Sequence, residues 1–304
     1  MRRTYLIGDI HGCHKELLEL EAVAREHARG AFVPSGEVRF VSVGDLVDRG
    51  PDSAAVVEHY LRGLKAKTHR AVYGNHEAMM INVFWDQRPD LMHAAGLGSA
   101  KSGSALAWNV KEEFGARREQ LSAAGIHTEA DFIEHETFNW IIQGGRETLQ
   151  SMGCVANRPE SWSPALPLLK YVAKLPLYWR NGKVVVTHAL MTRAELALVA
   201  RGASIKKKNK TRRLKAPVAK PKWTPAVIKA ARSAMWSRAI PPARPDPQRI
   251  HVSGHTPMKE VGQPMDGIVR IDTGCVYGER LTAYCVETGE ILSVASQTKW
   301  KQQS

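Results

Sequence analysis

Apolar and polar residues follow one another along the first third of the chain in blocks that predict strands and helices in turn. Short apolar runs that end at glycine predict strands, and apolar residues spaced three or four positions apart predict helices. The predicted strands cover 4–8, 39–44 and 69–74, and the predicted helices cover 14–28, 53–64 and 76–85. This β-α-β-α-β order indicates an α/β fold, with helices on both faces of a sheet and a site at the carboxyl ends of the strands.

The pattern changes in the second part of the chain. Between about 86 and 180 the periodicity is that of helices, which predicts a helical insertion or cap. Predicted strands then resume at 183–189, 249–255, 267–274, 281–287 and 290–295. Because the last three follow one another closely, we expect hairpins and a more antiparallel sheet there. The chain is thus expected to form a single domain over 1–304, with the helical insertion inside it.

Composition narrows the class of protein. The chain has 304 residues, of which 43% are apolar, enough to fill the core of a globular domain. There is neither a secretory signal nor an apolar run of the roughly 18 residues that a membrane span needs. The four cysteines are scattered without a C-x-x-C pair, which argues against a zinc knuckle or a disulfide framework. These features predict a cytoplasmic protein with no membrane partner.

The net charge of +13 comes from one segment. Fourteen Lys and Arg lie between 196 and 245, where there is no acidic residue, and without them 29 of the 43 basic residues remain against 30 acidic ones. The most basic part, 201–222, contains proline and few apolar residues, as is typical of a surface loop. Two interpretations stay open: a solvated loop, or a patch that binds an anionic partner such as RNA, an acidic protein or polyphosphate.

Polar side chains follow five of the predicted strands at the point where each strand ends. They are Asp9 and His11 after the first strand, Asp45 after the second, Asn75 and His76 after the third, and His188 and His255 at the ends of two later strands. Taken singly, each has a plainer explanation, such as a turn cap or a packed histidine. Together, carboxylate, amide and imidazole groups at one edge of a sheet suit divalent metals such as Mn, Fe or Zn.

Five motifs occur in an order that resembles a known family. They are GDIHG, GDLVDRG, GNHE, the strand-end His188 and GHTP, and they are similar to the motifs of calcineurin-like metallophosphoesterases, specifically the bacterial and phage branch of the phosphoprotein phosphatase (PPP) family. Two further segments, GGRETLQSMG and IDTGCVYGERLTAYCVETGE, also resemble that branch, and the second resembles symmetrical diadenosine tetraphosphatases as well. The resemblance covers about 1–85 and 180–295. It implies an α+β sandwich, in which central β-sheets are flanked by helices.

The resemblance also implies a centre with two divalent cations. Asp9 and His11 would hold one metal, Asn75, His188 and His255 the other, and Asp45 would bridge both. Manganese is the first expectation, with Fe, Zn, Ni or Co as alternatives. Such a pair can lower the pKa of a shared water toward about 7, so that the bridging hydroxide attacks the phosphorus atom directly.

The same resemblance assigns roles around the metals. His76 matches the general acid that protonates the leaving alkoxide, and Asp48 matches the carboxylate that orients this imidazole. Arg49 matches a phosphate clamp, because its guanidinium fork fits two phosphate oxygens. The candidates for a second clamp are Arg238 and, as an alternative, Arg146, and Tyr277 is expected to line the pocket.

Departures from related families narrow the substrate. GHTP has Pro257 where many metallophosphoesterases, nucleases included, have a second histidine, which disfavours a nuclease. Symmetrical diadenosine tetraphosphatases usually carry alanine in place of Asp48 and aspartate in place of Glu77. We therefore expect a phosphatase similar to serine/threonine protein phosphatases, acting on a phosphoprotein or a small phosphoester. The alternatives are a dinucleoside polyphosphate hydrolase, an RNA-cap-type pyrophosphohydrolase, and a non-catalytic module that binds RNA or another anion.

Overall fold

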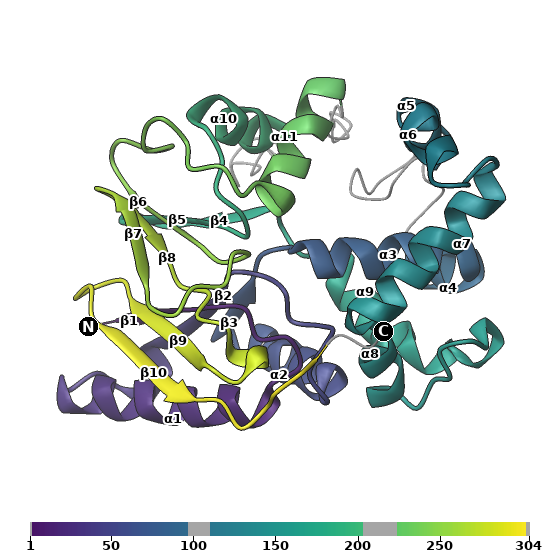
Figure 1. Ribbon diagram of the computed structural model, residues 1–304. Helices are drawn as coiled ribbons and strands as arrows, with labels where there is room; N and C mark the ends of the chain where they lie inside the picture. The colour runs from purple at the N-terminus through teal and green to yellow at the C-terminus, as the bar shows by residue number, and fades with distance from the viewer. Residues whose placement is uncertain (1, 97–109, 203–223, 302–304) are drawn as a thin grey trace, which may run out of the picture.

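The computed structural model describes residues 2–96, 110–202 and 224–301 (Figure 1). Its strands form two five-stranded sheets that pack face to face, with helices on the outer sides. A group of further helices lies to one side, on the right in Figure 1. The basic segment 201–222 falls almost wholly outside the described residues, so its role as a loop or an anion-binding patch stays a prediction.

The first sheet has the order β10-β9-β1-β2-β3. Its strands are β1 (Arg3–Ile7), β2 (Val38–Ser42), β3 (His69–Ala71), β9 (Arg280–Cys285) and β10 (Ile291–Ala295). β1, β2 and β3 are parallel, so their carboxyl ends lie at one edge of the sheet. β9 runs antiparallel to β1, and β10 forms a hairpin with β9.

The second sheet has the order β4-β5-β6-β8-β7. Its strands are β4 (Tyr178–Arg180), β5 (Val184–Thr187), β6 (Ile250–Ser253), β7 (Gly262–Met265) and β8 (Ile268–Arg270). β5, β6 and β8 are parallel, and the edge strands β4 and β7 are antiparallel to their neighbours. The carboxyl ends of β5 and β6 therefore also share an edge.

Side chains alternate between the two faces of the first sheet, as the period of a strand requires. In β1, Leu6 belongs to the core between the sheets, where it joins Val186 of β5 and Val252 of β6. Its neighbours Tyr5 and Ile7 belong to the other large core, which contains residues of the helices. Both faces of β1 are therefore buried, which explains its continuous apolar sequence.

The helices fall into three groups. α1 (His14–Gly30) and α2 (Ser53–Lys65) pack on the first sheet, and α10 (Arg193–Gly202) and α11 (Pro225–Trp236) pack against each other beside the second (Figure 1). The group at the side consists of α3 (Asn75–Gln87), α4 (Pro89–Ala94), α5 (Val110–Ala116), α6 (Arg118–Ala123), α7 (Glu129–Trp140), a π turn (Ile141–Gly145), α8 (Arg146–Ser151) and α9 (Leu166–Val172). Short 3-10 turns cover Ser35–Glu37, Pro159–Ser161, Ser163–Ala165 and Cys275–Tyr277. The described part of 86–180 is thus helical up to β4, and whether it is a separate cap stays a prediction.

Most predicted strands and helices are present within a few residues of their expected ends, but two expectations are wrong. β8 forms no hairpin with β9, because β8 joins the second sheet beside β6 while β9 pairs with β1 in the first. Helices do not cover both faces of one sheet either. The inner face of each sheet packs against the inner face of the other sheet, and valines of the second sheet bury the apolar side chains that were expected to contact helices. No helix in the described ranges is both long and apolar enough to span a membrane.

Candidate metal centre

The six predicted metal ligands meet where five strands of the two sheets end. Asp9 and His11 follow β1, Asp45 follows β2, Asn75 begins α3 after β3, and His188 and His255 follow β5 and β6. The backbone N–H of His255 donates to Asp9 Oδ2 at 3.0 Å, which joins the loop after β6 to the loop after β1. The structure therefore brings together residues as much as 246 positions apart.

The backbone is strained at this edge of the sheets. Among the described residues seven non-glycine residues have a positive φ, and five of them belong to the site: His11, Asp45, Asp48, Arg49 and His255. L-residues rarely adopt this conformation, which persists where surrounding bonds enforce it and is typical of functional sites. Here the N–H groups of Ile10 and His11 donate to the Asp45 carbonyl oxygen at 3.1 and 2.8 Å, which ties the first two loops together.

Glu77 and two glycines fix the loops that carry the carboxylates. Glu77 Oε2 accepts hydrogen bonds from the N–H groups of Gly74 and Asp45, both at 2.9 Å. Glu77 Oε1 accepts a hydrogen bond from the N–H of Leu46 at 2.7 Å. A Cβ atom on Gly74 would lie 2.2 Å from Asp45 Oδ1, and one on Gly254 would lie 1.9 Å from Asp9 Oδ1. Only glycine admits the carboxylates at these two positions, and Glu77 organises the loop of Asp45.

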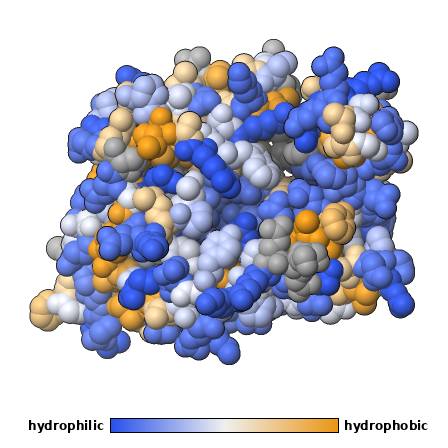
Figure 2. Space-filling model, viewed as in Figure 1, coloured by the Kyte–Doolittle hydropathy of each residue, from blue (hydrophilic) through white to orange (hydrophobic). Residues whose placement is uncertain are grey.

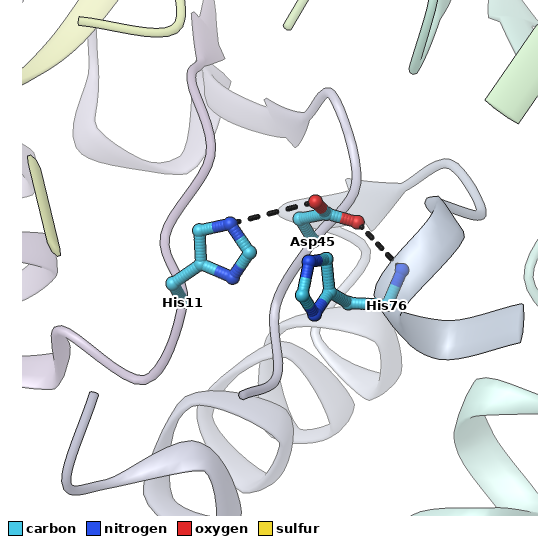
Figure 3. A group of neighbouring side chains, drawn as sticks. All are labelled: His11, Asp45 and His76. Atoms are coloured by element: carbon cyan, nitrogen blue, oxygen red, sulfur yellow. Dashed lines mark hydrogen bonds and ion pairs between the residues drawn. The ribbon is translucent and has the colours of Figure 1, made fainter. Parts of the chain in front are cut away.

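Asp45 lies at the centre of the group (Figure 3). Its Oδ2 is 3.5 Å from His11 Nε2, whereas its Oδ1 is 3.4 Å from His188 Nε2. The rings of His11 and His76 stand edge to face beside this carboxylate, with 4.6 Å between their centroids. One carboxylate thus presents a different oxygen to each half of the site, as a bridging ligand would.

The surroundings of His188 fit a metal better than a hydrogen bond. Burial lowers the pKa of this histidine to about 3, so the ring is neutral and carries a single N–H. Nevertheless Nδ1 lies 3.0 Å from the Val43 carbonyl oxygen and Nε2 lies 2.8 Å from Asn75 Oδ1, and both of these oxygens are acceptors. Asn75 also turns Oδ1, rather than its NH2 group, toward His255 Nδ1 at 2.9 Å. The neutral His188 ring can donate to only one of its two oxygens, so its other lone pair faces an acceptor and repels it unless a cation lies between them; the donor set therefore fits a divalent metal.

Three buried carboxylates crowd the same place. Burial raises the pKa of Asp9 well above its ordinary value, and the neighbouring Asp272 and Asp45 raise it further. Burial likewise raises the pKa of Asp45 to about 7 and that of Asp272 to about 6. Divalent cations would supply the positive charge that such a cluster needs. The sequence prediction missed Asp272, although it ends the strand-like run GIVRIDTG just as Asp9 and Asp45 end theirs.

His76 and Asp48 form a buried pair beside this centre. His76 Nδ1 lies 2.8 Å from Asp48 Oδ2, which leaves Nε2 as the nitrogen available to the site. Trp140 Nε1 donates to the same Oδ2 at 2.9 Å, and Thr148 Oγ1 donates to Oδ1 at 2.7 Å. Burial lowers the pKa of His76 and raises that of Asp48. The sequence prediction missed Trp140 and Thr148, which reach the pair from the group of helices at the side.

Arg49 and Tyr277 lie next to the group of predicted metal ligands, and their roles as clamp and pocket lining stay predictions. Arg49 Nη1 is 2.6 Å from His11 Nε2, so in this conformation the guanidinium donates to the lone pair that a metal would take. The guanidinium carbon lies 5.4 Å from the centroid of the Tyr277 ring. The guanidinium of Arg49 therefore lies beside the group of predicted metal ligands.

The two candidates for a second clamp lie in different places. Arg238 is exposed just beyond α11. Burial lowers the pKa of His255 to about 3, and the charges of His188 and Arg238 lower it further. Arg146 instead lines a cavity among the helices at the side, together with Phe138 and Gln150. The charge of Arg238 thus acts on His255, and which of the two arginines is the second clamp stays a prediction.

A family model of calcineurin-like phosphoesterases matches residues 2–285. The chain belongs to the calcineurin-like phosphoesterase family. This phosphoesterase is therefore a hydrolase that acts on phosphoester bonds, and its His and Asp groups are arranged so that they could hold the two metal ions of the family. The match confirms the family and the fold that the motifs predict.

Curated relatives of this phosphoesterase include bis(5'-nucleosyl)-tetraphosphatases. A symmetrical enzyme of Photorhabdus laumondii subsp. laumondii is 27% identical over 98% of this chain and 99% of its own length. An asymmetrical enzyme, PrpE, of Oceanobacillus iheyensis is 25% identical over 96% of this chain and 92% of its own. PrpE of Halalkalibacterium halodurans is 44% identical over 73 residues, which are 23% of this chain and 29% of that relative. Among solved structures, a protein serine/threonine phosphatase of Saccharomyces cerevisiae has 12% identity and a TM-score of 0.46, covering 100% of this chain and 81% of its own.

Proposed function

We propose that this phosphoesterase is a metal-dependent phosphatase of the serine/threonine phosphatase type, which hydrolyses phosphomonoesters such as phosphoserine or phosphothreonine. The observation that carries the proposal is the buried pair of His76 Nδ1 and Asp48 Oδ2, 2.8 Å apart, beside a group of residues that fits metals. A pair of this kind serves a leaving group that needs a proton. The mainly hydrophilic face in Figure 2 is compatible with a charged substrate.

The six strand-end residues would hold two divalent cations, with Asp45 between them. Ligands that are oxygen and imidazole, without thiolate, favour manganese, and Fe, Zn, Ni or Co are alternatives. Bound there, the cations would supply positive charge against the phosphate and acidify water for the attack. Neutral His188 and His255 suit this role, because a metal ligand must offer a lone pair.

His76 would give a proton from Nε2 to the oxygen of the leaving alcohol. Asp48 holds Nδ1, and so it fixes both the orientation of the ring and the place of its second proton. Burial and the charge of Arg49 lower the pKa of His76 in this state, and a phosphate bound beside Arg49 would add the negative charge that favours the imidazolium. An alkoxide is a poor leaving group without a proton, whereas a nucleoside phosphate leaves as a stable anion. The His76 and Asp48 pair therefore favours a monoester over a phosphoanhydride as the substrate.

Arg49 would bind two oxygens of the phosphate, and Arg238 would approach it from the side of His255. The position of Arg238 is supported by its effect on the pKa of His255, which follows that of burial and of His188. Tyr277 would close the pocket on the side of Arg49, because its ring lies 5.4 Å from the guanidinium carbon. These groups bind the part of the substrate that all phosphomonoesters share.

The second candidate is the hydrolysis of dinucleoside polyphosphates. It is favoured by the names of the two relatives that match almost the whole chain, both of which are bis(5'-nucleosyl)-tetraphosphatases. The same metals and arginines would serve either substrate, since both present a phosphate for in-line attack. The two candidates differ in the leaving group.

A panel of substrates with manganese, at equal enzyme concentration, separates the candidates. It would compare a phosphoserine peptide, p-nitrophenyl phosphate and diadenosine tetraphosphate. We expect the largest kcat/KM for a monoester. A kcat/KM for diadenosine tetraphosphate more than about tenfold above that for the phosphopeptide would replace the first candidate with the second.

His76→Asn tests the role of the acid on the same panel. General acid catalysis contributes about 10²–10⁴ in rate, so the variant should lose at least about a hundredfold in kcat on the phosphopeptide. It should lose much less on p-nitrophenyl phosphate, whose phenolate needs little protonation. His135→Asn, an exposed histidine of α7, is the control and should match the wild type. Equal losses on the two monoesters would contradict proton donation by His76.

A further inference from the structure

The end of the chain returns to the catalytic face. The segment 296–301 follows β10, and it is hydrogen-bonded to the buried carboxylate of Glu16 in α1. Glu16 Oε1 accepts hydrogen bonds from the N–H of Gln297 at 2.9 Å and from both the N–H and the hydroxyl of Thr298 at 3.0 Å. Two residues later, the N–H of Trp300 donates to the Val276 carbonyl oxygen at 2.8 Å. These bonds fix the backbone next to the turn that carries Tyr277.

The ring of Trp300 is also fixed. Its Nε1 donates to Glu147 Oε1 at 2.9 Å, and Glu147 lies in α8 directly before Thr148, which binds Asp48. The ring centroid is 6.3 Å from that of Tyr277. The C-terminal segment therefore places an indole between α8 and the turn at Cys275–Tyr277, where the two approach the loop of Arg49.

Arg49 lies against both rings. Its guanidinium carbon is 5.6 Å from the centroid of Trp300 and 5.4 Å from that of Tyr277, within the range of a cation–π interaction. At the same time Nη1 is 2.6 Å from His11 Nε2. The two aromatic rings thus restrict a long, flexible side chain to the side of the metal centre. An arginine that is already confined loses less entropy when it binds a phosphate.

We propose that Trp300 is a positioning residue for Arg49, so that the C-terminal segment completes the phosphate-binding site. This inference rests on the role of Arg49 as a phosphate clamp, which is part of the proposed function. The family model ends at residue 285, so Trp300 lies beyond the part of the chain that the family match covers. Trp300 acts through the aromatic face of its ring, and it does not touch the reacting atoms.

Two substitutions of Trp300 distinguish the effect of its aromatic face from the effect of having any large apolar side chain at this position. Trp300→Phe keeps an aromatic face, whereas Trp300→Leu keeps an apolar side chain without one. With the full-length, manganese-loaded enzyme, Trp300→Leu should raise the inhibition constant for inorganic phosphate and the KM for p-nitrophenyl phosphate about fivefold, the equivalent of roughly 1 kcal/mol. The value of kcat should change by less than about twofold, and Trp300→Phe should stay within about twofold in all three. A merely structural role would instead lower kcat through loss of folded enzyme.

Arg49→Ala distinguishes two reasons why Trp300→Leu could leave phosphate inhibition unchanged: Trp300 does not position Arg49, or Arg49 does not bind phosphate. If Arg49→Ala weakens phosphate inhibition and Trp300→Leu does not, the role of Trp300 is refuted while the proposed function stands. If neither variant changes phosphate inhibition, the clamp itself is refuted. The double variant should match Arg49→Ala, because without the guanidinium the indole has nothing to position. Thermal unfolding checks that each variant is folded. Phe32→Leu, at a position that is 94% exposed, is the control. If Trp300→Leu does not fold, Trp300→Met takes its place.

Discussion

Replacing Asp48 tests the link between the buried pair and the helices at its side. Asp48 is fully buried, and it accepts three side-chain hydrogen bonds, from His76, Trp140 and Thr148. In Asp48→Ala the Thr148 hydroxyl can turn to Ser53 Oγ, 3.0 Å away, but His76 Nδ1 and Trp140 Nε1 lose their acceptor. A buried donor without a partner costs about 1–3 kcal/mol, so two of them cost roughly 2–6 kcal/mol. The positive φ of 72° at this position adds strain for alanine.

Asp48→Asn separates the charge from the hydrogen bonds. Its carbonyl oxygen can accept from His76 and Trp140, which share Oδ2 in the wild type, and its NH2 group can donate to Thr148 Oγ1. Asparagine also tolerates a positive φ. The free energy of unfolding should therefore fall by less than about 1.5 kcal/mol. The value of kcat for a phosphoserine peptide should nevertheless fall at least about tenfold, because the imidazolium of His76 loses its counter-charge.

The assays are urea unfolding of the three proteins and turnover of the phosphopeptide with manganese. The expected order of stability is wild type, then Asp48→Asn, then Asp48→Ala. An alanine variant within about 0.5 kcal/mol of the wild type would contradict the role of the carboxylate as a shared acceptor. An asparagine variant with the wild-type kcat would show that the negative charge is not used.

Three further results are expected. His76→Asn should keep both manganese ions in elemental analysis; loss of one would identify His76 as a ligand, which its closeness to His11 and Asp45 also allows. Arg49→Ala should raise the inhibition constant for phosphate at least about tenfold, since a charged hydrogen bond contributes about 1.5–3 kcal/mol, and an unchanged constant would contradict the clamp. Glu21, which accepts from His59 Nε2 and His69 Nε2 at 2.8 Å, has a pKa of about 2 because these bonds outweigh burial. The pKa of Glu21 in the folded protein is below the ordinary 4.5, so Glu21→Gln should lower the free energy of unfolding by roughly 2–3 kcal/mol at pH 7. This difference between wild type and variant should disappear as the pH falls from 4.5 to about 2. A difference that is independent of pH would refute the linkage.

The sequence predicts the site residues that directly follow strands. Asp9, Asp45 and Asn75 each follow an apolar run, and parallel strands bring such positions to one edge, so local pattern was enough. Asp272 obeys the same rule, because it ends the run GIVRIDTG just as Asp9 and Asp45 end theirs.

Residues that reach the site from helices or from the chain end follow no local pattern. Trp140 contacts Asp48 across 92 positions, and its sequence neighbourhood predicts only a buried side chain in a helix. Trp300 sits beyond the last strand, where neither periodicity nor a motif marks it. The pairing of β8 was mispredicted for a related reason, because an apolar run shows that a strand is buried but not which sheet it joins.

Counting metal ions in the wild type and in Asp45→Asn tests the central claim most directly. The claim is that Asp45 joins two cations, because Oδ2 faces His11 and Oδ1 faces His188. Both proteins would be loaded with manganese, dialysed, and measured by elemental analysis against protein concentration. We predict two manganese ions per wild-type chain and fewer than one per Asp45→Asn chain, since the amide removes the charge that both ions share. A wild type that binds at most one ion, or a variant that keeps two, would contradict the account.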